Sequence, residues 1–96
     1  QSAIFRADVP PGEYEVRMAY SAHTNRARNV AVRIRHAKGE ATVLVDQRQW
    51  STPDSAPWQS LGTYEFAGPS EVVLDAQHAS GYVIADAVQW LPIAKD

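Results

Sequence analysis

Cysteine is absent from this 96-residue chain. The chain therefore has neither a disulfide framework nor a thiolate metal site, and its stability must come from packing. No apolar run approaches the ~20 residues of a membrane helix, so a membrane is not expected as a partner. No segment keeps a helical hydrophobic period of useful length, which favours an all-β fold.

A concentration of positive charge is missing too. Lys and Arg number 9 against 11 Asp and Glu, and the formal net charge is −2. The basic residues are scattered, apart from four arginines between residues 26 and 35. Nucleic acid is therefore not expected as a partner, because binding its phosphates requires dense positive charge.

The sequence contains no recognisable catalytic motif. His23, His36 and His78 are far apart, and no serine lies in a nucleophile-elbow pattern. Neither H-E-x-x-H nor a paired-carboxylate motif occurs. The isolated domain is not expected to be an enzyme, and a small hydrolase is kept only as a remote alternative because sites assemble in space.

Alternation of apolar and polar residues is abundant, and it is typical of half-buried strands. Pro10-Pro11-Gly12 and residues 67–70 are expected to turn the chain, and Gly62 is expected to mark a bulge. The predicted strands are residues 2–8, 13–20, 30–35, 41–46, 59–66, 71–75 and 81–90. These about seven strands predict an antiparallel β-sandwich, with a jelly roll as the leading version. We interpret residues 1–96 as a single module of a larger protein.

Asp86 interrupts the apolar face of the last predicted strand, where Ile84 and Val88 point inward. A buried carboxylate is costly unless it is paired. We favour a structural clamp, in which Asp86 pairs with neighbouring backbone N–H groups or with Arg26, over a metal ligand or a catalytic carboxylate. The reason is that no second carboxylate lies at ligand or catalytic spacing in this segment.

The longest stretch without a period, residues 47–57, holds Trp50 beside Gln49. Aromatic rings stack on sugar rings, so Trp50 is a candidate ligand platform, although it could instead pack as a lid on the sandwich end. A second polar loop contains Asn25 and Arg28, whose side chains suit a carboxylate-bearing polysaccharide. The predicted ligand-binding residues are therefore Trp50, Arg28, Asn25 and Gln49, whereas Trp58 and Trp90 are expected in the core.

Two further sets of charged residues are considered as binding sites. Arg33 and Arg35 form a basic row on the outer face of one strand, with Arg17 possible beside it, and this row is either a solvated face or a track for an anionic polymer. No cofactor is expected. A structural Ca²⁺ is an alternative to which Asp8, Glu13 and Asp75 would contribute, but their spacing identifies no site.

Several segments together resemble one known family. They are Gly12-Glu13-Tyr14-Glu15-Val16, Asn25-Arg26-Ala27, Val30 to Ile34 with His36, Trp58 to Phe66, and Gly81 to Val88. The pattern is similar to the golvesin C-terminal domain family, also described as the carbohydrate-binding-like domain of xanthan lyases. One departure is the connection between residues 47 and 58, which carries Trp50 and two prolines where a shorter glycine- or asparagine-rich connection is expected.

The resemblance implies a non-catalytic β-sandwich of the carbohydrate-binding-module kind. Such domains are accessory to secreted bacterial polysaccharide lyases, peptidases and oxidoreductase-like proteins. The expected function is polysaccharide binding within a secreted or cell-surface protein, and the parent is expected to be a polysaccharide lyase, a hydrolase or an oxidoreductase-like enzyme. The alternative is a structural domain that packs against sibling domains without binding sugar.

Overall fold

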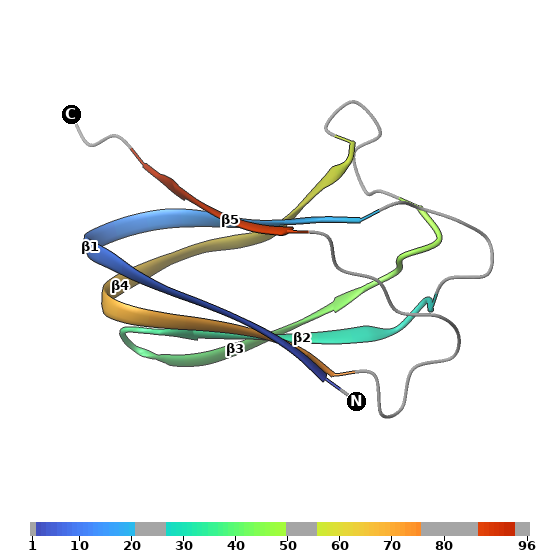
Figure 1. Cartoon of the computed structure of the whole chain (residues 1–96), viewed down its shortest axis with the longest axis horizontal. Coiled ribbons are helices and arrows are strands. Elements are labelled where there is room, and N and C mark those ends of the chain that lie inside the picture. The colour runs from blue at the N-terminus through green and yellow to red at the C-terminus, as the bar shows by residue number, and fades with distance from the viewer. Residues whose placement is uncertain (1, 21–26, 50–55, 76–86, 94–96) are drawn as a thin grey trace.

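A computed structural model describes residues 2–20, 27–49, 56–75 and 87–93, and its regular structure is built from five strands (Figure 1). The strands are β1 (Ser2–Ala19), β2 (Val30–His36), β3 (Gly39–Val45), β4 (Trp58–Asp75) and β5 (Ala87–Pro92). They form one antiparallel sheet in the order β3-β2-β4-β1-β5. Among these residues no helix has the length and apolar character to cross a membrane. The predicted all-β antiparallel fold is confirmed.

The two long strands fold this sheet over on itself. β1 and β4 have 18 residues each and pair along their whole length. The first half of β1 and the second half of β4 lie in one layer with β2 and β3, whereas the other halves lie in a second layer with β5. Both long strands bend at the same end of the molecule (Figure 1). The two layers of the sandwich are therefore two halves of one sheet.

The prediction that Pro10-Pro11-Gly12 ends a strand is wrong, because β1 continues through these residues. Pro10 and Pro11 lie at a register shift, where neither has a partner in β4, so their missing N–H groups cost the ladder nothing. The hydroxyl of Tyr14 donates a hydrogen bond of 2.7 Å to the carbonyl of Pro10 and holds the bend.

Residues 67–70 are likewise not a turn but part of β4, where Gly68 lies opposite Val9. The positive φ of 120° at Gly68 is open to glycine at little cost and lets β4 bend beside β1. Two pairs of predicted strands thus join into β1 and β4. The seven predicted segments become five strands for this reason.

The predicted bulge at Gly62 is confirmed. Val16 lies opposite Gly62 and Arg17 lies opposite Ser60, so Leu61 is the extra residue on β4. Because of the extra residue, the side chains that follow the bulge point to the opposite face from the one that strict alternation predicts. Leu61 and Phe66 are consequently both buried, although strict alternation would place them on opposite faces.

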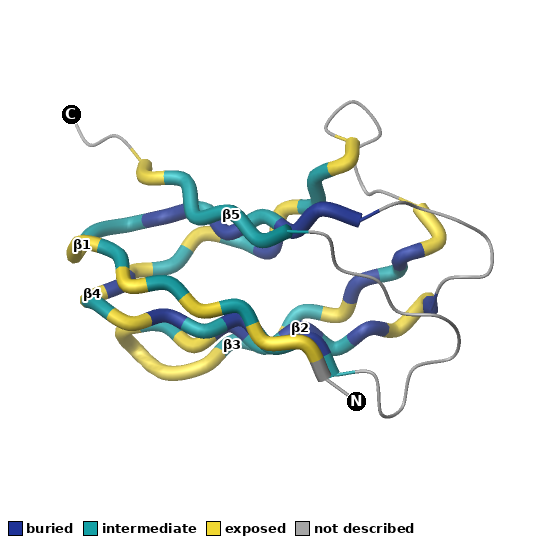
Figure 2. Tube along the Cα trace, viewed as in Figure 1, coloured by how far each residue is buried: buried dark blue, intermediate teal, exposed yellow. Residues whose placement is uncertain are grey.

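The core lies between the two layers (Figure 2). Phe5, Val9, Val88 and Trp90 pack against it as partly buried residues, while Trp58 is half-buried where β4 begins. The fully buried side chains come from both layers and include Val16, Met18, Tyr20, Val30, Val32, Ile34, Phe66, Val72 and Leu74.

Polar contacts also tie the two layers together. Trp90 of β5 donates from Nε1 to the buried Oγ of Ser70 (3.0 Å), and Ser70 donates in turn to the carbonyl of Arg35 on β2 (3.4 Å). The N–H of Ala37 donates to the carbonyl of Glu65 (2.8 Å) across the same gap. These bonds link three elements that are far apart in the sequence.

Candidate functional site

The strand ends opposite the bends of β1 and β4 converge at one end of the sandwich (Figure 1). The N–H of Tyr20 donates to the carbonyl of Pro57 (3.2 Å), and the N–H of Gln47 donates to the carbonyl of Ala27 (2.8 Å). Ala19 lies opposite Ala87 in the sheet. We call this region, defined by Tyr20, Ala27–Arg28, Asp46–Gln49 and Pro57, the loop-bearing end.

Tyr20 anchors the backbone of the loop-bearing end from inside the core. Its side chain is fully buried, and its hydroxyl donates to the carbonyl of Gln49 at 2.8 Å, with the carbonyl of Asp46 at 3.4 Å. Burial, with a smaller contribution from the Asp46 carboxylate, raises the pKa of Tyr20 to about 12. The backbone that leads to position 50 is therefore held in place by a neutral hydroxyl at ordinary pH.

Two arginines act on one carboxylate at this end. Arg48 binds Asp46 through Nε (2.9 Å) and Nη2 (2.8 Å), and its backbone N–H donates to the same carboxylate (3.0 Å). These hydrogen bonds, more than the positive charge of Arg28, hold the pKa of the Asp46 carboxyl below its ordinary value. The exposed Arg28 and Arg48 suit a ligand with its own carboxylate.

A small cavity of about 80 Å³ adjoins this cluster and is lined by residues 43–46 of the β3 end, Gln49 and Gln59. One water occupies ~30 Å³ of liquid volume, so this cavity holds a few waters and no sugar ring. A sugar at this end would therefore lie on the surface, with the polar side chains beneath it.

The structure brings two of the predicted ligand-binding residues together. Arg28 and Gln49 are both exposed at the loop-bearing end, where the charge of Arg28 acts on Asp46 and Gln49 lines the small cavity with Asp46. Trp50 and Asn25, and the predicted clamp residues Asp86 and Arg26, lie outside the described residues. Their roles remain predictions. Sequence reasoning missed Asp46 and Arg48, which are a carboxylate and a cation two residues apart directly after a strand.

The predicted basic row of Arg33 and Arg35 is not purely positive. Arg35 lies between Glu40 and Glu71 of the neighbouring strands, so carboxylates interrupt the positive charge. Arg17 is not beside this row, because it lies in the other layer and binds Glu15 at 2.9 Å. The outer face of β2 is a mixed-charge surface.

Metal ligands do not gather in the described parts of the chain, where no group of three or more His, Cys, Asp or Glu residues has the geometry to hold an ion. Asp8, Glu13 and Asp75 lie opposite three different positions of the β1–β4 ladder.

Comparison with known proteins shows which family the domain belongs to. The profile of the golvesin C-terminal domain matches residues 1–91. This chain belongs to the golvesin C-terminal domain family. A xanthan lyase of Bacillus sp. (strain GL1) is 37% identical over 99 residues, which cover 97% of this chain and 10% of that protein. The family resemblance expected from the sequence is confirmed.

A solved structure of a Paenibacillus xanthan lyase contains the same fold. It superposes with a TM-score of 0.85 at 36% identity, covering 97% of this chain and 9% of that chain. The chain therefore spans about a tenth of the length of the relatives that it matches.

Proposed function

We propose that this domain is a non-catalytic accessory module of a larger, secreted bacterial protein, and that it binds an acidic polysaccharide at its loop-bearing end. A polysaccharide lyase is the proposed parent, since the domain resembles a tenth of two xanthan lyases. The observation that carries the binding proposal is the arrangement of Arg28 and Arg48 around Asp46, beside the anchored backbone that leads to Trp50.

The chemistry of this end favours sugars with carboxylates. A guanidinium group offers a planar fork of donors that matches a carboxylate, and such charge-assisted bonds are about twice as strong as neutral ones. Trp50 is proposed to stack on an adjacent sugar ring, and Gln49 and Asn25 are proposed to bind hydroxyl groups. Weak binding at one such site becomes useful when the module is tethered to an enzyme acting on the same polymer.

Affinity electrophoresis in gels that contain xanthan, alginate or a neutral glucan tests this proposal. The wild-type domain is expected to be retarded by at least one acidic polymer. Arg28→Ala and Trp50→Ala are each expected to weaken binding by about tenfold, equivalent to ~1.4 kcal/mol. Lys38→Ala is the matched control, because it removes one exposed positive charge from the β2–β3 turn, at the other end of β2.

Two outcomes would contradict the proposal. One is that no acidic polymer retards the wild-type domain. The other is that Lys38→Ala weakens retardation as much as Arg28→Ala, since general charge attraction would then explain the binding.

A second candidate function is packing against a sibling domain. The observation in its favour is that Leu44 is 70% exposed and Ile4 is 48% exposed, both on the outer face of the layer that contains β2. Under this alternative, Leu44→Ser and Ile4→Ser lower the melting temperature of the parent protein but not that of the isolated domain. If the parent is unaffected, these residues are ordinary exposed side chains.

A further inference from the structure

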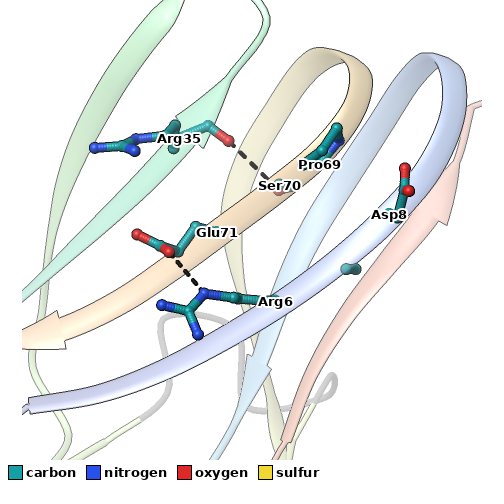
Figure 3. Close-up of a pocket in the computed structure, with 7 residues that line it drawn as sticks. Arg6, Asp8, Arg35, Pro69, Ser70 and Glu71 are labelled. Carbon is teal, nitrogen blue, oxygen red and sulfur yellow. Dashed lines mark hydrogen bonds and ion pairs between the residues drawn. The ribbon is translucent and has the colours of Figure 1, made fainter.

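A second pocket, of about 350 Å³, lies where the sheet bends (Figure 3). We call it the corner pocket, and its lining comes from three strands: Arg6 to Asp8 of β1, Arg35 of β2, and Pro69 to Glu71 of β4. Its volume falls in the range of small-molecule sites, ~300–1,000 Å³, and suits one or two sugar rings. The bends lie at the end of the sandwich away from the loop-bearing end (Figure 1).

The charges of the corner pocket alternate and cancel. Register places Glu71 between Arg35 and Arg6 on neighbouring strands. Arg6 donates from Nε to Oε2 of Glu71 at 2.9 Å, and the two side chains point toward each other in Figure 3. With Asp8, the pocket has two cations and two anions. An anionic ligand would gain from the arginines and lose to the carboxylates, so the pocket favours a neutral one.

Several side-chain donors and acceptors in this pocket have no hydrogen-bond partner in the parts of the chain that the structure describes. Among the described residues, neither the guanidinium of Arg35 nor the carboxylate of Asp8 has a hydrogen-bond partner, and Arg6 uses only Nε toward Glu71. Adjacent sugar hydroxyls each donate and accept, so one pair of hydroxyls can satisfy a carboxylate and a guanidinium together. Neutral polyols fit this mixed set better than ligands that only accept.

Buried hydrogen bonds hold the backbone around the pocket. Ser70 is buried, and its hydroxyl binds the carbonyl of Arg35 and accepts from Trp90, which fixes the β2 backbone beside β4. Pro69, with its fixed ring, and Ala7 supply apolar surface between the charged groups. Apolar surface with a few polar groups is the usual composition of a small-molecule site.

We propose that the corner pocket binds a neutral pyranose unit, as a second subsite at the other end of the domain from the acidic-sugar site. The domain is 41 Å along its longest axis. Sites at its two ends would engage different parts of one polymer, or two polymers, and raise avidity without further contacts. This site extends the proposed function but does not depend on it, since it shares no residue with the loop-bearing end.

An NMR titration of the ¹⁵N-labelled domain with the neutral disaccharides cellobiose, maltose and lactose tests the proposal. At least one is expected to shift the amide signals of Ala7, Ser70 and Glu71 saturably. Sodium glucuronate is expected to shift these signals less, because its carboxylate meets Asp8 and Glu71. If the acidic-sugar site also exists, glucuronate shifts the signals of Arg28 and Gln49 instead.

Matched variants separate the corner pocket from other effects. Arg35→Ala and Glu71→Gln are each expected to weaken disaccharide binding by about tenfold. Arg33→Ala is the control, because Arg33 lies two residues away on the same face of β2 and outside the pocket. Arg28→Ala is expected to leave disaccharide binding unchanged even if it abolishes polysaccharide binding. Unchanged melting temperatures establish that each variant is folded.

The proposal is overturned if no disaccharide shifts the corner signals up to its solubility limit. It is also overturned if Arg33→Ala weakens binding as much as Arg35→Ala. Loss of polysaccharide retardation in gels, with the corner shifts intact, would refute the acidic-sugar site alone.

Discussion

At the scale of single residues, Ser70 has an importance that its size does not suggest. Its hydroxyl accepts from Trp90 and donates to the carbonyl of Arg35, so one buried group joins β5, β4 and β2. Ser70→Ala is expected to destabilise the domain by ~1–3 kcal/mol, because it leaves buried polar groups unpaired. Urea unfolding followed by circular dichroism measures this loss.

Ser60 provides the control for that experiment. It lies on the same strand, but its hydroxyl binds Glu15 on the exposed surface, so Ser60→Ala is expected to cost less than ~1 kcal/mol. Trp90→Phe should also cost less in the Ser70→Ala background than in the wild type. Strict additivity of Ser70→Ala and Trp90→Phe would show that the bond between them contributes nothing.

Tyr20 gives the domain a pH dependence at high pH. Its pKa is about 12 when folded, against an ordinary value of 10.0, because burial disfavours the charged phenolate. Below pH 10 the hydroxyl is protonated in both states. Between pH 10 and 12 the unfolded state loses its proton first, so the stability that Tyr20 contributes falls as the pH rises.

Tyr20→Phe tests this behaviour. At pH 8 it is expected to destabilise the domain by ~1–3 kcal/mol, because the carbonyl of Gln49 loses its donor. The difference in unfolding free energy between wild type and variant should shrink from pH 10 upward. A difference that stays constant to pH 12 would mean that Tyr20 is not buried as described.

At the scale of elements, the bulge on β4 depends on Gly62. Its φ of 108° is unfavourable for other residues, and a Cβ there would lie 2.7 Å from the hydroxyl oxygen of Tyr64. Gly62→Ala is expected to lower stability by more than the ~1–3 kcal/mol of backbone strain alone. Gly39→Ala is the control, since Gly39 also has a positive φ, of 132°, but nothing within 4 Å of the added Cβ. Equal losses for the two variants in thermal unfolding would exclude the contact with Tyr64.

Alternation in the sequence predicted the strands well, whereas proline and glycine predicted turns at two places where the chain continues as one strand. The register shift in β1 leaves Pro10 and Pro11 without partners, so prolines that would interrupt a regular ladder are tolerated. The register shift depends on how β1 pairs with β4, which cannot be read from the sequence of β1 alone. The bulge at Gly62, by contrast, was predictable, because a glycine inside an alternating segment is typical of a bulge.

The candidate sites were predictable to different extents. Arg28 was predicted from the affinity of its guanidinium group for carboxylates, and Gln49 from its place beside Trp50 in a stretch without a period; both are exposed. The lack of a period does not by itself predict exposure, since Gln47 in the same stretch is fully buried. The corner pocket left no such signal. Arg6, Arg35 and Glu71 become neighbours only through the pairing of three strands, and register over such distances cannot be read from one sequence.

At the scale of the whole molecule, folding one sheet over itself gives the domain two distinct ends. The bends of β1 and β4 create the corner pocket, whereas the free strand ends gather Arg28, Asp46 and Arg48. With the two proposed sites, the module would hold a polymer at two places without a deep cleft. Its proposed value to a parent enzyme is to keep the substrate near, since tethering raises the effective concentration.

The most direct test of this account compares binding to xanthan with binding to xanthan whose carboxyl groups have been reduced to alcohols. Isothermal titration of the wild-type domain is expected to show binding to the native polymer, weakened about tenfold or more by the reduction, because Arg28 and Arg48 lose their charged partners. Equal affinity for the two polymers, or no binding to either, would contradict the claim that the loop-bearing end recognises an acidic polysaccharide.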